Sequence, residues 1–158
     1  MTIQNIDAAV SAADLQTIKD AFATIEQKLP FLVNLTVDDR KSIVKIGPGS
    51  FMFVTKALSG AQANPHIFPD TFDTEAFKRD VDLFVVLTEL NTLANQISEQ
   101  IDDTRMAAGG EAMRQARQSY EYIKTAAKTE PGLKALAEEL GERFKKGPGE
   151  GPETPPKS

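Results

Sequence analysis

Apolar residues between positions 83 and 101 recur at alternating steps of four and three residues, and this spacing is the strongest constraint on the fold. Because a helix turns once every 3.6 residues, such steps place the side chains on one stripe of a helix. The stripe consists of Leu83, Leu87, Leu90, Ala94, Ile97 and Ile101. Phe84, Val85 and Val86 make the first half of this helix apolar nearly all round. A helix of that kind is typically buried, so residues 74 to about 106 are predicted to form the central helix of the core.

The helical period recurs in the rest of the chain. Further apolar residues at helical spacing are Leu15, Ile18, Phe22, Ile25 and Leu29, then Met113, Ala116, Tyr120, Ile123 and Ala127, and then Leu133, Leu136, Ala137, Leu140 and Phe144. No segment has the period of two that is typical of a strand. The apolar segment 30–36, PFLVNLT, lacks a partner strand and is interpreted as a buried connector. The sequence predicts an all-α fold, an antiparallel bundle of four to five helices with a short extra helix.

Capping residues predict where the helices begin. Side-chain oxygens at a helix start accept hydrogen bonds from its free amides, and Ser, Thr and Asp suit that position. The predicted caps are Ser11, Thr36, Ser50, Asp73 and Thr129. Asp14 and Asp39 follow the first two caps by three residues, as in a capping box. The third cap predicts a helix over Phe51 to about Ala63, and Pro131 suits the first turn of the last helix.

Gly109 and Gly110 predict the end of the central helix, because glycine readily adopts the left-handed conformation that closes a helix. The chain would then reverse, and the next helix would run antiparallel to the central one. A spacing of four also links Ala108, Ala112 and Ala116 to Ile101 and Ile97, which fits one continuous helix. Of these two alternatives the break is favoured.

A single domain is predicted for residues 1–146. The segment 147–158 has the composition of a flexible tail, since its prolines and glycines provide nothing to bury.

Composition narrows the classes of partner and compartment. The chain has 18 basic and 23 acidic residues and a net charge of −5, which gives no footprint for nucleic acid. It has no cysteine, which excludes disulfides and thiolate metal sites. The N-terminus lacks a signal-peptide pattern and no stretch has 18 apolar residues in a row, so a cytoplasmic protein without membrane contact is expected.

The segment KIGPGS, residues 45–50, resembles a phosphate-binding loop only superficially. A Walker loop ends in Gly-Lys-Ser/Thr, whereas here Lys45 precedes the glycines and Pro48 removes an amide from the loop. The segment is therefore interpreted as a turn. A weak anion site on the amides of Gly49 and Ser50, at a helix N-terminus, is the remaining functional possibility.

A polar cluster surrounds the predicted reversal at the glycines. Its candidate ligand-binding residues are Glu99, Asp102, Asp103, Arg105, Glu111 and Arg114, with Arg117 nearby. Carboxylates and guanidinium groups brought together in this way would bind a polar small molecule if they were buried. Clusters of this kind are more often solvated ion pairs at a helix end.

Other sites for chemistry find little support. His66 is the only histidine, and no Glu-x-x-His pattern of a di-iron bundle is present, so no metal site and no cofactor are predicted. No serine has a histidine placed to activate it, and no catalytic residue is assigned. Six phenylalanines gather in the middle third of the chain, at positions 51, 53, 68, 72, 77 and 84. They are interpreted as core, or as an apolar groove for a partner if helices leave them exposed.

Several quoted segments together resemble a family of small uncharacterised bacterial helical proteins. They are LPFLVNLT, KIGPGSFMFVTKAL, the NP loop, DDTRMAAGGEA and the AAK…PG…EEL ending, and the resemblance covers Leu29 to Phe144. It implies a bacterial, helical context, and no activity or site residue comes with it.

These observations predict a non-enzymatic helical protein that acts through protein–protein interaction or self-assembly. The alternative is a carrier or sensor that binds a small molecule between helices, at the polar cluster or among the phenylalanines.

Overall fold

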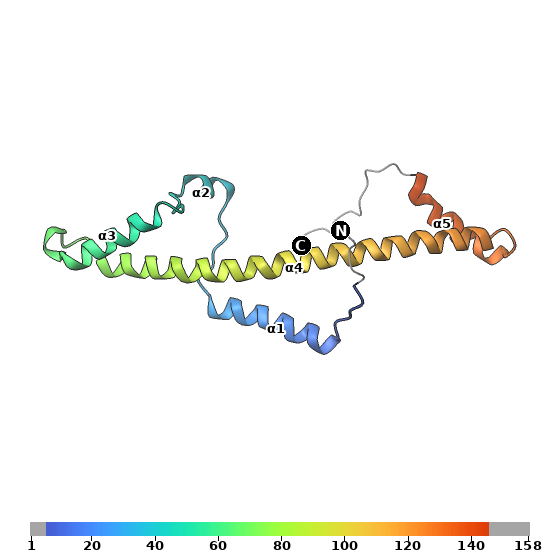
Figure 1. Cartoon of the computed structure of the whole chain (residues 1–158), viewed down its shortest axis with the longest axis horizontal. Helices are drawn as coiled ribbons and strands as arrows, with labels where there is room; N and C mark the ends of the chain where they lie inside the picture. Colours follow the sequence, from blue (N-terminus) through green and yellow to red (C-terminus); the bar gives the residue numbers. More distant parts are fainter. Residues whose placement is uncertain (1–5, 146–158) are drawn as a thin grey trace. The chain divides into compact units, whose positions relative to one another are not determined.

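The computed structural model describes residues 6–145, and all regular secondary structure within them is helical. The α-helices are α1 (Ala12–Lys28), α2 (Val37–Ser42), α3 (Phe51–Ala63), α4 (Thr74–Ala126) and α5 (Lys134–Lys145) (Figure 1). Two short 3-10 turns lie at Pro65–Ile67 and Pro131–Leu133. The predicted all-α fold of four to five helices with a short extra helix is confirmed, since α2 is short and four longer helices accompany it. The predicted tail, residues 147–158, lies outside the described residues.

Three of the predicted caps form as expected. The Ser11 hydroxyl accepts a hydrogen bond of 3.0 Å from the amide of Asp14 at the start of α1. Thr36 and Asp39 make a full capping box on α2, with amide-to-oxygen distances of 3.1 Å and 3.0 Å. At the start of α4, Asp73 accepts a bond of 2.7 Å from the amide of Ala76. Local side-chain chemistry therefore sets these three helix starts.

Two other predicted caps are wrong. Ser50 precedes α3, but its backbone has helical angles (φ −85°, ψ −21°) and its hydroxyl makes no capping bond. Capping oxygens reach the free amides from an extended backbone, which explains the loss. The hydroxyl of Thr129 donates to the carbonyl of Ala126, 3.2 Å away, at the end of α4. The next element is the 3-10 turn at Pro131–Leu133, and α5 follows it directly.

The predicted helix break at Gly109 and Gly110 is also wrong. Both glycines lie inside α4, which continues to Ala126, and no described glycine has a positive φ. Two glycines cost a helix roughly 2 kcal/mol relative to alanine. Breaking the helix would cost several backbone hydrogen bonds, and alanines at positions 107, 108 and 112 favour the helix on both sides. The segments on either side of the glycines are therefore one helix and not an antiparallel pair.

The chain divides into two compact units, and α4 contributes to both. The unit Ala8–Glu99 is best packed at the α3–α4 corner, which we define as α3, the loop 64–73 and the first turns of α4 up to Phe84. Figure 1 shows α3 beside these turns. Leu58 and Ala61 on α3 and Val81 on α4 are buried, and the rings of Phe51 and Phe84 are 6.0 Å apart. These side chains form the core of the corner.

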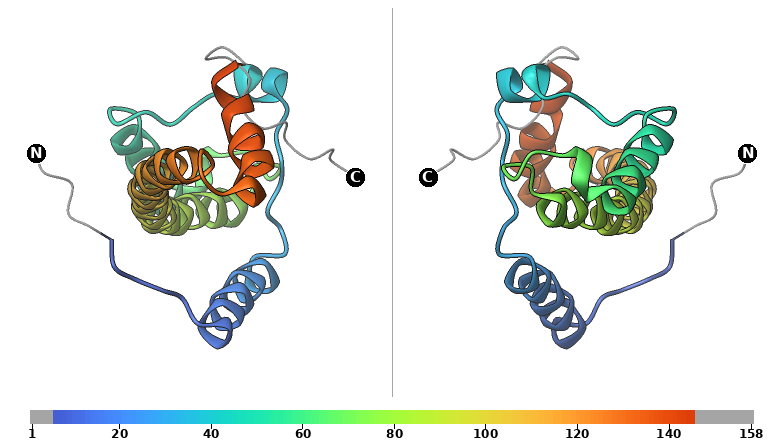
Figure 2. Two further views of the ribbon diagram at one scale, coloured as in Figure 1. Left: turned by 90° about the vertical axis from the view of Figure 1, so that its right-hand side faces the viewer. Right: turned by 90° about the vertical axis from the view of Figure 1, so that its left-hand side faces the viewer.

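The other unit joins residues 6–7 to residues 100–145 and is held by the last turns of α4 and by α5 (Figures 1 and 2). Tyr120 of α4 stacks on Phe144 of α5, with ring centroids 5.3 Å apart. A Cβ added at Gly141 would lie 3.1 Å from the Tyr120 hydroxyl. Gly141 therefore allows α5 to lie close to α4.

Candidate functional site

The apolar stripe of the central helix is exposed in the unit Ala8–Glu99. We call Leu83, Leu87, Leu90, Ala94 and Ile97 the α4 seam. Leu83 and Leu90 each expose 39% of their surface and Ile97 exposes 53%, while Leu87 is half-buried. Val86 and Leu93, on the face next to the seam, are 49% and 53% exposed, and Val85, on the opposite side of α4, is 45% exposed. A helix segment with the composition of a buried helix is thus open to solvent.

The α4 seam is nearly free of charge. Among residues 83–98, only Glu89 carries an ionisable side chain. A helix that faces solvent normally carries many charged side chains on its outer surface, and the rest of α4 has them. Water is therefore a poor environment for this segment of α4, and a protein surface is a good one.

Helix α1 exposes a second apolar stripe. Leu15, Ile18, Phe22 and Ile25 are 47%, 46%, 56% and 51% exposed, and none of the residues of α1 is buried. We call these four residues the α1 stripe. Their steps of three and four residues match the anchors of an amphipathic helix that packs against another helix. The predicted buried connector after α1 is exposed as well, since Phe31, Leu32 and Val33 expose 49%, 53% and 76% of their surface. That prediction is wrong, because no element of the unit covers the segment.

The phenylalanines of the middle third of the chain differ in their surroundings: some contact one another in the α3–α4 corner, and others are exposed. In the α3–α4 corner, the rings of Phe68 and Phe72 are 4.8 Å apart, and those of Phe72 and Phe77 are 6.3 Å apart. Phe53 is 74% exposed. The rings of the corner contact one another without full burial, since Phe72 and Phe84 are still 41% and 36% exposed.

The predicted polar cluster lies along one helix. Because α4 does not reverse, Asp102 and Arg114 are twelve residues apart on it, about 18 Å along the axis. Arg105 pairs with Asp102 at 2.5 Å, and both side chains are exposed. The hydrogen bond and the charge of Asp102 raise the pKa of Arg105. Asp103 is also exposed. This part of the cluster is a solvated ion pair with a neighbouring carboxylate.

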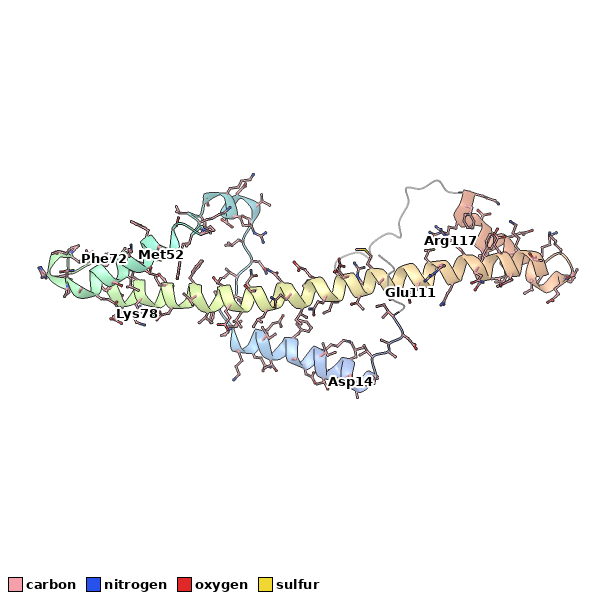
Figure 3. The ribbon with its side chains drawn as sticks, viewed as in Figure 1. Asp14, Met52, Phe72, Lys78, Glu111 and Arg117 are labelled. Atoms are coloured by element: carbon pink, nitrogen blue, oxygen red, sulfur yellow. The ribbon has the colours of Figure 1, made fainter. Side chains whose placement is uncertain are left out.

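The remaining cluster residues lie at two other places. Glu99 is exposed in the unit Ala8–Glu99. Glu111, labelled in Figure 3, accepts a bond of 2.9 Å from the amide of Ile6 and so ties residue 6 to α4. Arg114 and Arg117 are exposed on α4. The structure thus shows a structural role for Glu111, while a ligand-binding role for the cluster stays a prediction.

The turn at residues 45–50 offers fewer donors than an anion site needs. The amide of Ser50 donates to the carbonyl of Gly47, 2.9 Å away, and so already has a partner. Neither Gly49 nor Ser50 is buried. An anion at this position stays a prediction with little geometric support.

Concave and metal-binding features are few in the part of the chain that the structure describes. A shallow hollow is lined by Glu26, Leu29, Pro30, Leu32, Val33 and Asn34, and it includes none of the predicted ligand residues. Residues 6–145 contain no group of three or more acidic or histidine side chains placed to hold a metal ion. Within the same residues, no helix has the length and apolar character needed to cross a bilayer.

Comparison of the chain with protein-family models, curated proteins and solved structures gives no match. The resemblance to small bacterial helical proteins accordingly stays a prediction.

Proposed function

We propose that the protein acts through protein–protein interaction and that the α4 seam and the α1 stripe are its contact surfaces. The observation that carries this proposal is the exposure of the uncharged segment 83–98 of α4. Contiguous exposed apolar surface on a helical protein marks an interaction site, and anchors at steps of three and four residues suit a helical partner.

The energetics favour coverage by a protein surface. Completing the burial of a half-exposed leucine or isoleucine contributes about 1 kcal/mol. The seam and the stripe together hold seven such large side chains that are 39% to 56% exposed. Their combined burial is enough to offset the roughly 4–15 kcal/mol entropic cost of association only if most of them are covered at once. We therefore propose one extended helical interface and not a small contact.

The alternative of a small-molecule carrier receives less support. Ligand sites are concave and combine apolar walls with a few polar groups. The α4 seam lies on a single helix face, and the exposed pair of Asp102 and Arg105 has no apolar wall.

The absence of cysteine is compatible with a reducing compartment, and we propose the cytoplasm as the site of action.

Thiol reactivity tests whether the seam is available to another chain. The protein has no cysteine, so Ile97→Cys introduces a single thiol in the seam, and Thr92→Cys provides a matched thiol on the exposed opposite side of α4. In a dilute sample shown to be monomeric, both thiols are expected to react with a maleimide at similar rates. Protection of the Ile97→Cys thiol in the monomer would contradict the proposal, because the chain would then cover the seam itself.

A further inference from the structure

We infer that the partner of the α4 seam is the α4 seam of a second copy of this chain. The two helices pack antiparallel, and the twofold axis crosses the seam at the level of residue 92 along α4. This inference rests on the proposed function, since it names the partner of the same surface. Three features support it: the width of the apolar face, the area that it offers and the order of its side chains.

The apolar face of α4 is wider than one helix can cover. The seam occupies one stripe, and Val86 and Leu93 widen it on one side, with a helical step of seven between them. A strict seam matches one partner helix, whereas a wider face matches two. The α1 stripe is narrow, so it can pack against one partner helix only. A second α4 on the seam, with an α1 on the widened side, covers the whole face.

The exposed apolar area matches a stable dimer. Apart from the half-buried Leu87, the large side chains of the widened α4 face and of the α1 stripe are between 39% and 56% exposed. Together these side chains offer roughly 800 Å² per copy, and a stable interface buries about 800 Å² per partner. A closed twofold dimer places the same patch on both chains and leaves no apolar face to continue the assembly.

The order of side chains favours the antiparallel arrangement. About a centre at Thr92, Leu87 lies opposite Ile97 of the second copy, and Leu90 lies opposite Ala94. Each large side chain then meets an apolar partner, and the small Ala94 is filled by a leucine, as dense packing requires. A parallel pair would set Ala94 against Ala94 and leave a gap in the centre of the seam. Antiparallel helix dipoles also attract each other weakly.

The charge of the segment does not oppose this pairing. Glu89 is the only ionisable residue between positions 83 and 98, and it lies off the seam on the exposed side of α4. No like charges therefore face each other across the central layers of the pair, where they would be destabilising.

Disulfide trapping in the cysteine-free chain tests both the partner and the orientation. Leu87→Cys and Ile97→Cys are prepared as separate proteins and oxidised alone and as an equimolar mixture, with Thr92→Cys as the control. The antiparallel pair predicts linked dimers in the mixture and several-fold fewer in either protein alone. Efficient linkage of each protein with itself would overturn the antiparallel arrangement and leave the proposed function intact.

Spin labels provide a measurement that leaves the seam unchanged. Thr92 and Glu99 are seven residues apart on the exposed side of α4, so labels there avoid the proposed contact. In an antiparallel pair, the distance between the two labels at position 99 includes an axial offset of about 21 Å that is absent at position 92. Equal distances at both positions would indicate a parallel pair. A monomer at all concentrations, with a reactive Ile97→Cys thiol, would overturn the second copy as partner while the proposed function stands.

Discussion

The first turns of α4 and the seam that follows them are neighbouring parts of one helix with opposite surroundings. Val81 is 7% exposed because α3 lies against it, whereas Leu90 is 39% exposed and Ile97 is 53% exposed. Both segments have the apolar spacing of a buried helix. The difference lies in what is available to cover them. In the α3–α4 corner, Ala61 of α3 is 1% exposed.

This contrast shows that burial depends on a partner and not on composition alone. Where the chain returns after α3, it forms a small core from a few side chains. Along the seam, no helix of the described chain supplies that cover, and a composition typical of a core is left at the surface.

Leu90→Glu should abolish self-association. The substitution places two uncompensated charges in the dimer seam, each costing several kcal/mol, so the dissociation constant should rise at least 100-fold. Glutamate and leucine have similar helix propensity, so α4 itself should persist. Sedimentation velocity measures the effect, and Thr92→Glu, on the exposed side of the same turn, is the control and should associate like the wild type.

Leu58→Ala should weaken the α3–α4 corner without affecting the seam. Leu58 is 9% exposed, and truncation of a buried leucine costs about 2–3 kcal/mol. Amide exchange should accelerate in α3 and in the first turns of α4. Met52→Ala, at a side chain that is 59% exposed, should change the free energy of opening measured by amide exchange by less than about 0.5 kcal/mol. Equal effects of the two variants would mean that the corner is not packed as described.

Gly110→Ala should stabilise α4 by about 1 kcal/mol, because alanine is the better residue inside a helix. A Cβ added at Gly110 meets no atom within 4 Å. Circular dichroism during thermal unfolding measures the change. Destabilisation would instead indicate that the glycine adopts a left-handed conformation and that the helix breaks there.

The two serines at helix starts should respond differently to alanine. Ser11 makes a capping bond and Ser50 makes none. Ser11→Ala should cost about 1 kcal/mol and Ser50→Ala less than about 0.5 kcal/mol. Chemical unfolding of both variants measures the loss in the free energy of unfolding. A larger loss for Ser50→Ala than for Ser11→Ala would indicate that Ser50 caps α3 and would contradict the described geometry.

The capping box of α2 should lose its effect in acid. The hydrogen bonds from the Thr36 hydroxyl and then from the Thr36 amide lower the pKa of Asp39. A lowered pKa means that the box stabilises α2 above the ordinary pKa of aspartate and that this stabilisation is lost as the pH falls through the pKa of Asp39. An NMR titration of the Asp39 carboxylate should show the lowered pKa, and Thr36→Val should bring it back toward the ordinary value. An unchanged pKa in the variant would exclude the hydroxyl as the cause.

The elements with local signals could be predicted from sequence, and those that depend on the whole chain could not. The starts of α1 and α2 follow from Ser11 and Thr36, whereas α3 has the predicted bounds, Phe51–Ala63, although the predicted Ser50 cap does not form. The glycines at 109 and 110 carry a helix-stop signal that the cooperativity of a long helix outweighs. The ligand cluster was expected around a reversal that does not form, so its residues are spread along α4.

Which apolar face is covered has no local signal at all. The spacing of Leu83 to Ile97 predicts burial, and it contains no information on whether the cover comes from the same chain or from another one. The near absence of charge between positions 83 and 98 is a sequence signal that distinguishes this segment from the rest of α4, and the prediction from apolar spacing did not use it.

Sedimentation equilibrium of the wild-type chain over a wide concentration range tests the central claim most directly. The account predicts a molar mass that rises with concentration from 17.2 kDa toward twice that value. A constant 17.2 kDa at all concentrations, together with a reactive thiol in the monomeric Ile97→Cys variant, would contradict pairing with a second copy.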